Sequence, residues 1–114
     1  LEAYQVAKQL AIEVYNVAAQ LPMTERFELS RQLRRAAVSV GSNVAEGCGR
    51  STRPDFARFL DDALGSAYEL EFQLELCIEC GLAPRTESER AVETARRVQQ
   101  MLTRLIIKLR RSGA

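Results

Sequence analysis

The fold of this chain is decided by residues 25–59, which read ERFELSRQLRRAAVSVGSNVAEGCGRSTRPDFARF. Apolar and small side chains recur along the first part of this stretch at the three- and four-residue spacing of an amphipathic helix. The main stripe consists of Leu29, Leu33, Ala36, Ala37, Val40, Val44 and Cys48. Gly47 is placed to adopt the left-handed backbone conformation that often closes a helix. We therefore predict a helix over residues 25–47 that presents this stripe to a core.

The same helix carries a second, narrower stripe, which is made up of Phe27, Arg34, Val38, Gly41 and Ala45. Together with the first stripe, it leaves the helix apolar or small around more than half of its circumference. A helix of this kind is either central in a bundle or shared with a neighbouring subunit. We favour the shared arrangement and predict that these five residues lie in a subunit interface.

Helical patterns continue on both sides of the opening stretch. Four helices are expected, over residues 2–21, 25–47, 53–80 and 87–111. Amphipathic helices of similar length that are joined by short turns pack as antiparallel neighbours. The sequence therefore predicts a single all-α domain over residues 1–114, an up-down-up-down antiparallel four-helix bundle.

The helix ends carry recognisable signals. Pro22 ends the first helix, because the residue before a proline is pushed out of the helical region. Thr24 and Thr52 are placed to cap the second and third helices. Thr86 and Glu89 have the spacing of a capping box at the start of the fourth.

The third helix also carries an apolar stripe on the side away from its core face. Gly65, Tyr68, Phe72 and Leu76 recur along it and are flanked by acidic residues. Apolar residues that are aligned away from a core mark an interaction surface. We predict that these four residues belong to a subunit interface as well.

The composition is that of one helical domain. The chain has 114 residues, of which 46% are hydrophobic, and no tryptophan. Its three cysteines, an odd number, fit a reducing compartment better than a disulfide framework. No apolar run approaches the ~20 residues that span a bilayer, so no membrane is expected as a partner. A cytoplasmic location is the expectation.

The net charge is only +1, but the charges are segregated. Residues 59–93 hold nine acids against two arginines, whereas residues 94–114 hold six basic residues and no acid. Such segregation indicates surfaces that complement one another or an external partner. The opening stretch itself contains seven arginines, at positions 26, 31, 34, 35, 50, 53 and 58.

Five of these arginines point away from the predicted core and can line a phosphate backbone: Arg31, Arg35, Arg50, Arg53 and Arg58. They form the candidate nucleic-acid-binding set. The alternative is a solvated surface with ion pairs to nearby acids. Arg26 and Arg34 lie closer to the apolar stripes, where they can pair with acids across an interface.

The sequence lacks the combinations of side chains that a catalytic site or a metal site needs. Cys77 and Cys80 have CxxC spacing, but the chain has no histidine and only one further cysteine to complete a zinc site. The pair also lies near the C-terminal end of a predicted helix, where the helix dipole does not activate a thiol. No base is available for a serine nucleophile. We expect no catalytic residue, no metal, no cofactor and no small-molecule substrate.

Spaced identities along nearly the whole chain resemble a bacterial family of four-helix-bundle proteins, the 23S rRNA intervening-sequence protein family. The resemblance is carried by Leu21-Pro22-x-x-Glu25-Arg26-Phe27, Gln32-Leu33-Arg34-Arg35-Ala36-Ala37-x-Ser39-Val40, Asn43-Val44-Ala45-Glu46-Gly47-x-Gly49-Arg50, Phe56-x-x-Phe59-Leu60 and Gly65-Ser66-x-x-Glu69-Leu70-Glu71-x-Gln73-Leu74. It implies a homo-oligomer of bundles, with a pentameric ring known in the family. A related accessory protein of diversity-generating retroelements is pentameric and basic, and binds nucleic acid and a reverse transcriptase.

Our reading is a non-enzymatic, self-associating helical bundle that serves as an accessory protein on RNA or another nucleic acid. Its expected partners are further copies of itself, in a pentamer, and RNA or a nucleic-acid-processing protein. The alternative is a scaffold that binds only proteins and no nucleic acid. That scaffold would use the acidic face of the third helix or the basic stripe of the fourth, which consists of Arg90, Arg97, Arg104, Lys108 and Arg111.

Overall fold

The structure is a computed structural model that describes residues 1–25 and 27–112. The elements are α1 Glu2–Ala19, the short 3₁₀ helix η1 Met23–Glu25, α2 Leu29–Cys48, α3 Arg53–Glu79 and α4 Arg85–Ser112. Within these residues there is no strand, so the prediction of an all-α fold is confirmed.

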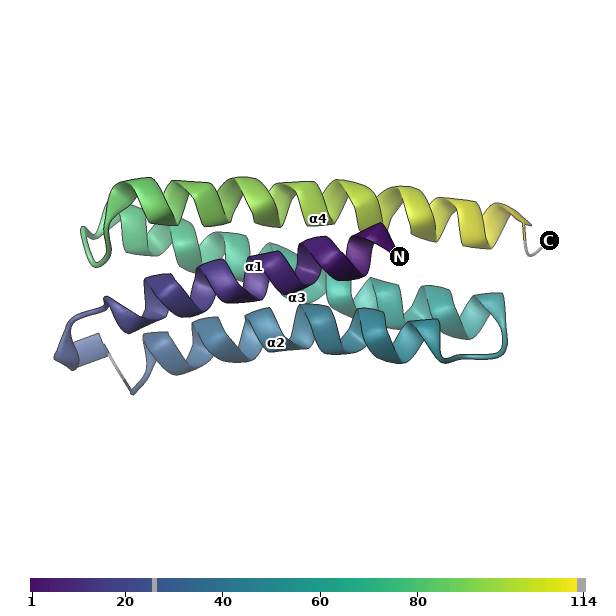
Figure 1. The fold of residues 1–114 in the computed structure, drawn as a ribbon, viewed down its shortest axis with the longest axis horizontal. Helices are drawn as coiled ribbons and strands as arrows, with labels where there is room; N and C mark the ends of the chain where they lie inside the picture. The colour runs from purple at the N-terminus through teal and green to yellow at the C-terminus, as the bar shows by residue number, and fades with distance from the viewer. Residues whose placement is uncertain (26, 113–114) are drawn as a thin grey trace.

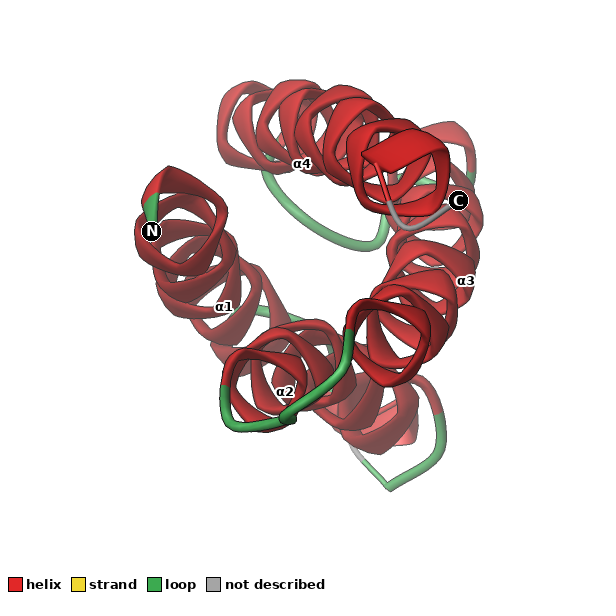
Figure 2. Cartoon of the chain, turned by 90° about the vertical axis from the view of Figure 1, so that its right-hand side faces the viewer, coloured by secondary structure: helices red, strands yellow, loops and turns green. Residues whose placement is uncertain are grey.

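Consecutive helices run in opposite directions and lie side by side (Figure 1). Viewed end-on, the four helices surround one centre, with α1 next to both α2 and α4 (Figure 2). The bundle measures 49 × 21 × 18 Å, so it is long and narrow. The predicted up-down-up-down bundle is the observed architecture.

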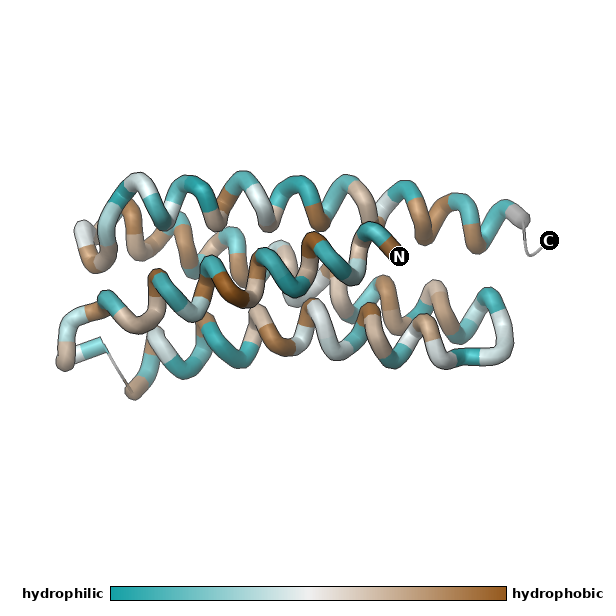
Figure 3. The backbone as a smooth tube through the Cα atoms, in the orientation of Figure 1, coloured by the Kyte–Doolittle hydropathy of each residue, from teal (hydrophilic) through white to brown (hydrophobic). Residues whose placement is uncertain are grey.

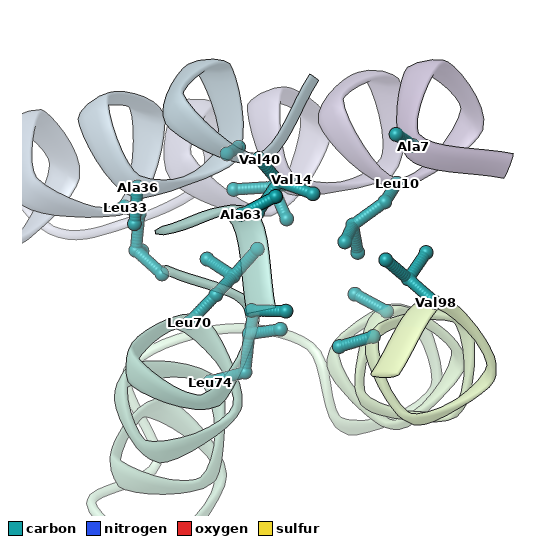
Figure 4. Close-up of a cluster of buried hydrophobic side chains, with 14 of the residues drawn as sticks. Ala7, Leu10, Val14, Leu33, Ala36, Val40, Ala63, Leu70, Leu74 and Val98 are labelled. Atoms are coloured by element: carbon teal, nitrogen blue, oxygen red, sulfur yellow. The ribbon is translucent and has the colours of Figure 1, made fainter. Parts of the chain in front are cut away.

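The core fills the space between the four helices. Apolar and polar residues alternate along each helix at about the helical period (Figure 3), and the apolar ones meet inside, as Leu10, Leu33, Leu70 and Val98 do (Figure 4). These four side chains come from four different helices, and each is fully buried. Burying a leucine or valine of this kind stabilises a fold by about 1.5–3 kcal/mol. Of the predicted main stripe, five residues are buried: Leu33, Ala36, Ala37, Val40 and Val44. Leu29 is partly buried, and Cys48 is exposed.

Two predicted helix ends around the first turn are wrong. α1 ends at Ala19 rather than at Leu21, and α2 begins at Leu29 rather than at Glu25. Between them the chain forms η1, in which the Glu25 N–H donates to the Pro22 carbonyl at 2.9 Å. Thr24 therefore lies inside a 3₁₀ turn and does not cap α2. The proline displaced the helix start because it favours a tight turn directly after itself.

The start of α4 also differs from the prediction. The helix begins at Arg85 instead of residue 87, directly after Pro84. Ser88 is buried, and its N–H and Oγ both donate to the Pro84 carbonyl, at 3.1 and 2.9 Å. The capping box between Thr86 and Glu89 does not form. Proline, which fits at or just before the first turn of a helix, outweighs the box here.

The third helix begins as predicted. Thr52 is extended, and its Oγ1 accepts a hydrogen bond from the Asp55 N–H at 3.3 Å. At its other end, α3 closes through Gly81, which has a φ of +63°. The N–H groups of Gly81 and Leu82 donate to the carbonyls of Ile78 and Cys77, the two bonds of a Schellman motif.

Gly47 does not have the left-handed conformation predicted for it. Gly81 has the only positive φ in the described part of the chain. Gly47 instead lies inside α2 and is buried. A Cβ atom there would approach Phe56 Cδ1 at 2.9 Å and Phe59 Cβ at 3.1 Å. Glycine is needed at this position because the last turn of α2 comes close to the first turns of α3.

Candidate nucleic-acid interface

The five candidate arginines are all exposed, but the structure does not bring them together. Arg31 and Arg35 lie near the start of α2, whereas Arg50, Arg53 and Arg58 lie around the α2–α3 turn. Arg35 and the end of α2 are about 20 Å apart along the helix, at a rise of about 1.5 Å per residue. The predicted set is therefore two separate groups.

We call the group at the α2–α3 turn the turn cluster; it consists of Arg50, Arg53, Arg58 and Phe59. The guanidinium carbons of Arg50 and Arg58 lie 4.6 and 4.7 Å from the centroid of the Phe59 ring. Arg58 also pairs with Asp55, at 3.6 Å between Nη2 and Oδ1, in an exposed ion pair. Stacking on an aromatic ring restricts an arginine side chain while its N–H donors stay available.

The local sequence explains how the turn cluster is held. The close approach at Gly47 seats Phe59 against the end of α2, so that the ring is half-buried. The turn between Gly49 and Thr52 then carries Arg50 back over that ring. Arg53 stands in the first turn of α3, where the helix N-terminus adds partial positive charge. The cluster presents three cations at one end of the bundle.

The second group lies beside a hollow of about 380 Å³ between α2 and α3. We call it the α2–α3 hollow; its lining residues are Arg31, Gln32, Arg35, Ala36, Ser39, Ser66 and Glu69. Ser39 Oγ and Ser66 Oγ are 2.8 Å apart and partly buried. The Asn43 Nδ2 group donates to the Ser39 carbonyl at 2.9 Å and to its Oγ at 3.2 Å.

The basic residues of α4 fall into two kinds. Arg96 and Arg110 pair with acids of α3: Arg96 Nε is 2.8 Å from a carboxylate oxygen of Glu71, and Arg110 Nη1 is 3.3 Å from one of Asp61. The oppositely charged segments predicted from the sequence therefore complement each other in part. The predicted basic stripe lies elsewhere on α4 and is exposed. Within the described residues, Arg97 is the one member of the stripe with an ion pair, to Glu2 at 3.6 Å.

Glu71 is the best-connected acid of α3. Gln99 Nε2 donates to its Oε1 at 2.7 Å, and Arg96 donates to its Oε2. The hydrogen bond from Gln99, followed by that from Arg96, lowers the pKa of the Glu71 carboxyl below its ordinary value, although partial burial opposes them. The carboxylate is thus held in its charged form between α3 and α4.

The two predicted interface stripes lie on different sides of the bundle. Tyr68, Phe72 and Leu76 of α3 are 55%, 65% and 39% exposed, and Gly65 is exposed beside them. On α2, Val38, Gly41 and Ala45 line a groove of about 270 Å³ together with residues of α1. Phe27 is exposed, and Arg34 is half-buried. Arg26 lies outside the described residues. The assignment of these stripes to a subunit interface stays a prediction.

The three cysteines differ in how far they are buried. Cys77 is buried in the core, and burial, followed by the nearby Cys80 and Glu25, raises the pKa of its thiol to about 11. Cys48 and Cys80 are exposed. In residues 1–25 and 27–112, no three side chains among cysteine, aspartate and glutamate gather as metal ligands. In the same residues, no helix is long and apolar enough to cross a membrane.

Sequence reasoning missed two features of these sites. Phe59 is not among the predicted site residues, although its ring supports Arg50 and Arg58. The alternation of arginine and phenylalanine around the turn was the available signal. The paired hydroxyls of Ser39 and Ser66 had no signal in the sequence, because their meeting depends on how α2 and α3 are aligned along their axes.

Comparison with known proteins places the chain among bacterial helical bundles. A family model described as 23S rRNA-intervening sequence protein matches residues 1–104. A crystal structure of a protein of unknown function from the S23 ribosomal protein family, from Bacteroides thetaiotaomicron, has a TM-score of 0.84 to this chain. The two are 27% identical over 91% of this chain and 97% of that one. No curated protein matches.

Proposed function

Because this chain belongs to the 23S rRNA-intervening sequence protein family, we propose that it is a non-enzymatic, self-associating bundle that binds RNA as an accessory protein. The name of the family refers to a segment of ribosomal RNA, so structured RNA is the natural ligand to test. The observation that carries the proposal is the turn cluster, in which Phe59 holds Arg50 and Arg58 within 5 Å of one ring.

The turn cluster suits a phosphate backbone for two reasons. Stacked guanidinium groups lose less conformational entropy on binding than free ones, and their N–H forks match phosphate oxygens. Arg53 and the first turn of α3 add positive charge beside them. A chain with a net charge of +1 needs such a local concentration of cations to attract a polyanion.

Self-association is the second part of the proposal. The bundle has two different apolar surfaces on different sides. One consists of exposed aromatic residues on α3, and the other is the apolar groove between α1 and α2. Contacts between unlike surfaces run head to tail and close into rings when the rotation allows it. We propose that this chain forms such a ring, a pentamer. Ring formation would also repeat the turn cluster around the assembly, so that one RNA could meet several copies.

Binding of a fluorescent structured RNA, measured by anisotropy between about 50 and 200 mM salt, tests the RNA function. We expect binding that weakens with salt and a double variant, Arg50→Ala with Arg58→Ala, that binds at least tenfold more weakly. The logarithmic salt slope should also fall by roughly one to two units, since each lost phosphate contact removes about 0.7–0.9.

The matched control is Arg104→Ala with Lys108→Ala, which removes the same charge from the exposed stripe of α4. If both double variants weaken binding equally, the attraction is general and the turn cluster is not the site. If no RNA binds at low salt, the proposal fails. The scaffold that binds only proteins then becomes the better account.

A further inference from the structure

We propose that the α2–α3 hollow binds a nucleoside monophosphate, with the phosphoryl group on Arg31, Arg35 and the serine pair. This site is separate from the turn cluster and goes beyond RNA-strand binding. Three observations carry the inference: a serine pair held in place at the wall of the hollow, two arginines without an ion pair among the described residues, and one carboxylate that lines the same hollow.

The serine pair supplies a hydroxyl donor at the wall of the hollow. Either serine can donate in the hydrogen bond between Ser39 Oγ and Ser66 Oγ. The other serine then keeps one O–H that can donate to a group in the hollow, because both serines line it. Asn43 uses its amide to hold Ser39 in place, so the pair is fixed rather than free to rotate away. A hydroxyl held in this way can donate to an oxygen of a ligand in the hollow.

The two arginines are placed to complete an oxyanion site. Arg31 and Arg35 are one helical turn apart, so they project from the same face of α2. Neither forms an ion pair within residues 1–25 and 27–112, although Glu69 lines the same hollow. Two guanidinium forks and a hydroxyl can satisfy the several oxygens of one phosphoryl group.

Glu69 and the size of the hollow indicate what is attached to that phosphoryl group. About 380 Å³ is more than one phosphate fills and lies at the small end of ligand sites. The Glu69 carboxylate would accept hydrogen bonds from ribose hydroxyls or a base N–H. It would also repel a second phosphate. The site is therefore expected to prefer a nucleoside monophosphate to a diphosphate and to inorganic phosphate.

Isothermal titration of the whole chain with adenosine and guanosine monophosphate, the corresponding diphosphates and inorganic phosphate tests this inference. We expect a monophosphate to bind at least several-fold more tightly than its diphosphate. The double variant Arg31→Gln with Arg35→Gln should weaken it by tenfold or more, since the charge-assisted hydrogen bonds to the phosphoryl group are lost. Glu69→Gln should raise the affinity for the diphosphate relative to the monophosphate.

The control variant, Arg50→Gln with Arg58→Gln, should bind the monophosphate like the unaltered chain. Both arginine pairs are exposed, so these variants should fold, which circular dichroism will verify. No binding of any mononucleotide at about 5 mM, or equal loss in both double variants, would overturn the inference. If the Arg50 and Arg58 variant loses RNA binding but still binds the monophosphate, the mononucleotide site is not contradicted. The two proposals can therefore be refuted independently.

Discussion

Gly47 shows at the scale of one residue how the bundle positions its turn cluster. The glycine lies in the last turn of α2, and its missing Cβ makes room for Phe56 and for the Cβ of Phe59. Glycine inside a helix is unfavourable by roughly 0.5–1 kcal/mol relative to alanine. Here glycine fits because a Cβ atom would come within 2.9 Å of Phe56 Cδ1 and 3.1 Å of Phe59 Cβ, so that a side chain would force α2 and α3 to shift.

The variant Gly47→Ala is expected to lower the free energy of unfolding by about 1 kcal/mol. Overpacking by one methyl group typically costs about 1–3 kcal/mol, and the gain in helix propensity offsets part of that cost. Urea denaturation followed by circular dichroism measures the change, at a concentration where all variants have the same assembly state.

The control for this prediction is Gly41→Ala. Gly41 also lies within α2, but nothing approaches within 4 Å of a Cβ built there. Its substitution should raise stability by about 0.5–1 kcal/mol through helix propensity alone. If Gly47→Ala is equally stabilising, the close contact with Phe56 and Phe59 does not restrict the position.

At the scale of the elements, α3 and α4 are joined by charge as well as by the core. The bonds of Arg96 to Glu71 and of Arg110 to Asp61 link acids of one helix to arginines of the next. Exposed ion pairs of this type contribute little to stability, because water screens the charges. Their main effect is to engage two arginines of the most basic segment, whereas Arg97 is the one stripe residue with an ion pair among the described residues.

The stability contributed by Glu71 should depend on pH. Its folded-state pKa lies below the ordinary value of 4.5, so its hydrogen bonds stabilise the fold above that pH and are lost as the pH falls through the lower folded value. Glu71→Gln should therefore lower the free energy of unfolding by about 1 kcal/mol at neutral pH. The difference should shrink as the pH falls below the ordinary value and disappear once the pH is below the lowered folded-state pKa.

Urea denaturation at several pH values between about 3 and 7 measures this dependence. Glu79→Gln serves as the control, since Glu79 is exposed and has no ion pair or side-chain hydrogen bond in the described part of α3. A Glu71→Gln effect that stays constant down to the lowest pH would show that the charge of Glu71 contributes nothing.

At the scale of the whole molecule, the bundle leaves several large apolar side chains exposed on its surface. Phe72 is 65% exposed and Tyr68 55% exposed on one side, and the apolar groove lies between α1 and α2. Aligned exposed aromatic residues of this kind are typical of interaction sites. They are the surfaces through which we propose that copies of this chain assemble.

Phe72→Glu is expected to disrupt that assembly without unfolding the bundle. Buried aromatic anchors of interfaces contribute about 2 kcal/mol or more, so the association constant should fall by roughly 30-fold. Size-exclusion chromatography with light scattering should then show a mass near 12.8 kDa, that of one chain, instead of a multiple of it.

Ile107→Glu is the matched control, because Ile107 of α4 is 49% exposed but lies outside both stripes. It should leave the mass of the assembly unchanged. If the unaltered chain is already a monomer at about 100 μM, self-association through these surfaces is wrong. If the chain assembles into a number of copies other than five, the proposed pentamer is wrong, but the proposed interface is not contradicted.

Much of the fold could be predicted from the sequence because the signals are local. The spacing of Leu33, Val40 and Val44 reports the buried face of α2, and Thr52 with Pro54 marks where α3 begins. The predicted first residues of α2 and α4 are wrong, and a proline precedes each of these helices. After Pro22 the chain makes a 3₁₀ turn that delays α2, and after Pro84 it begins α4 early. In both cases the proline's own geometry overrode a plausible capping residue.

The candidate sites were less predictable, because they depend on how neighbouring helices are turned and shifted along one another. By itself, the sequence determined a four-helix bundle, its core stripes and the exposure of its arginines, since the helical period alone decides which residues share a face. Only the tertiary structure decided that Arg31 and Arg35 flank a hollow while Arg50 and Arg58 share Phe59. It also decided that Gly47 is a contact point rather than a helix end. Contacts between helices depend on axial offset, which the period of a single helix does not contain.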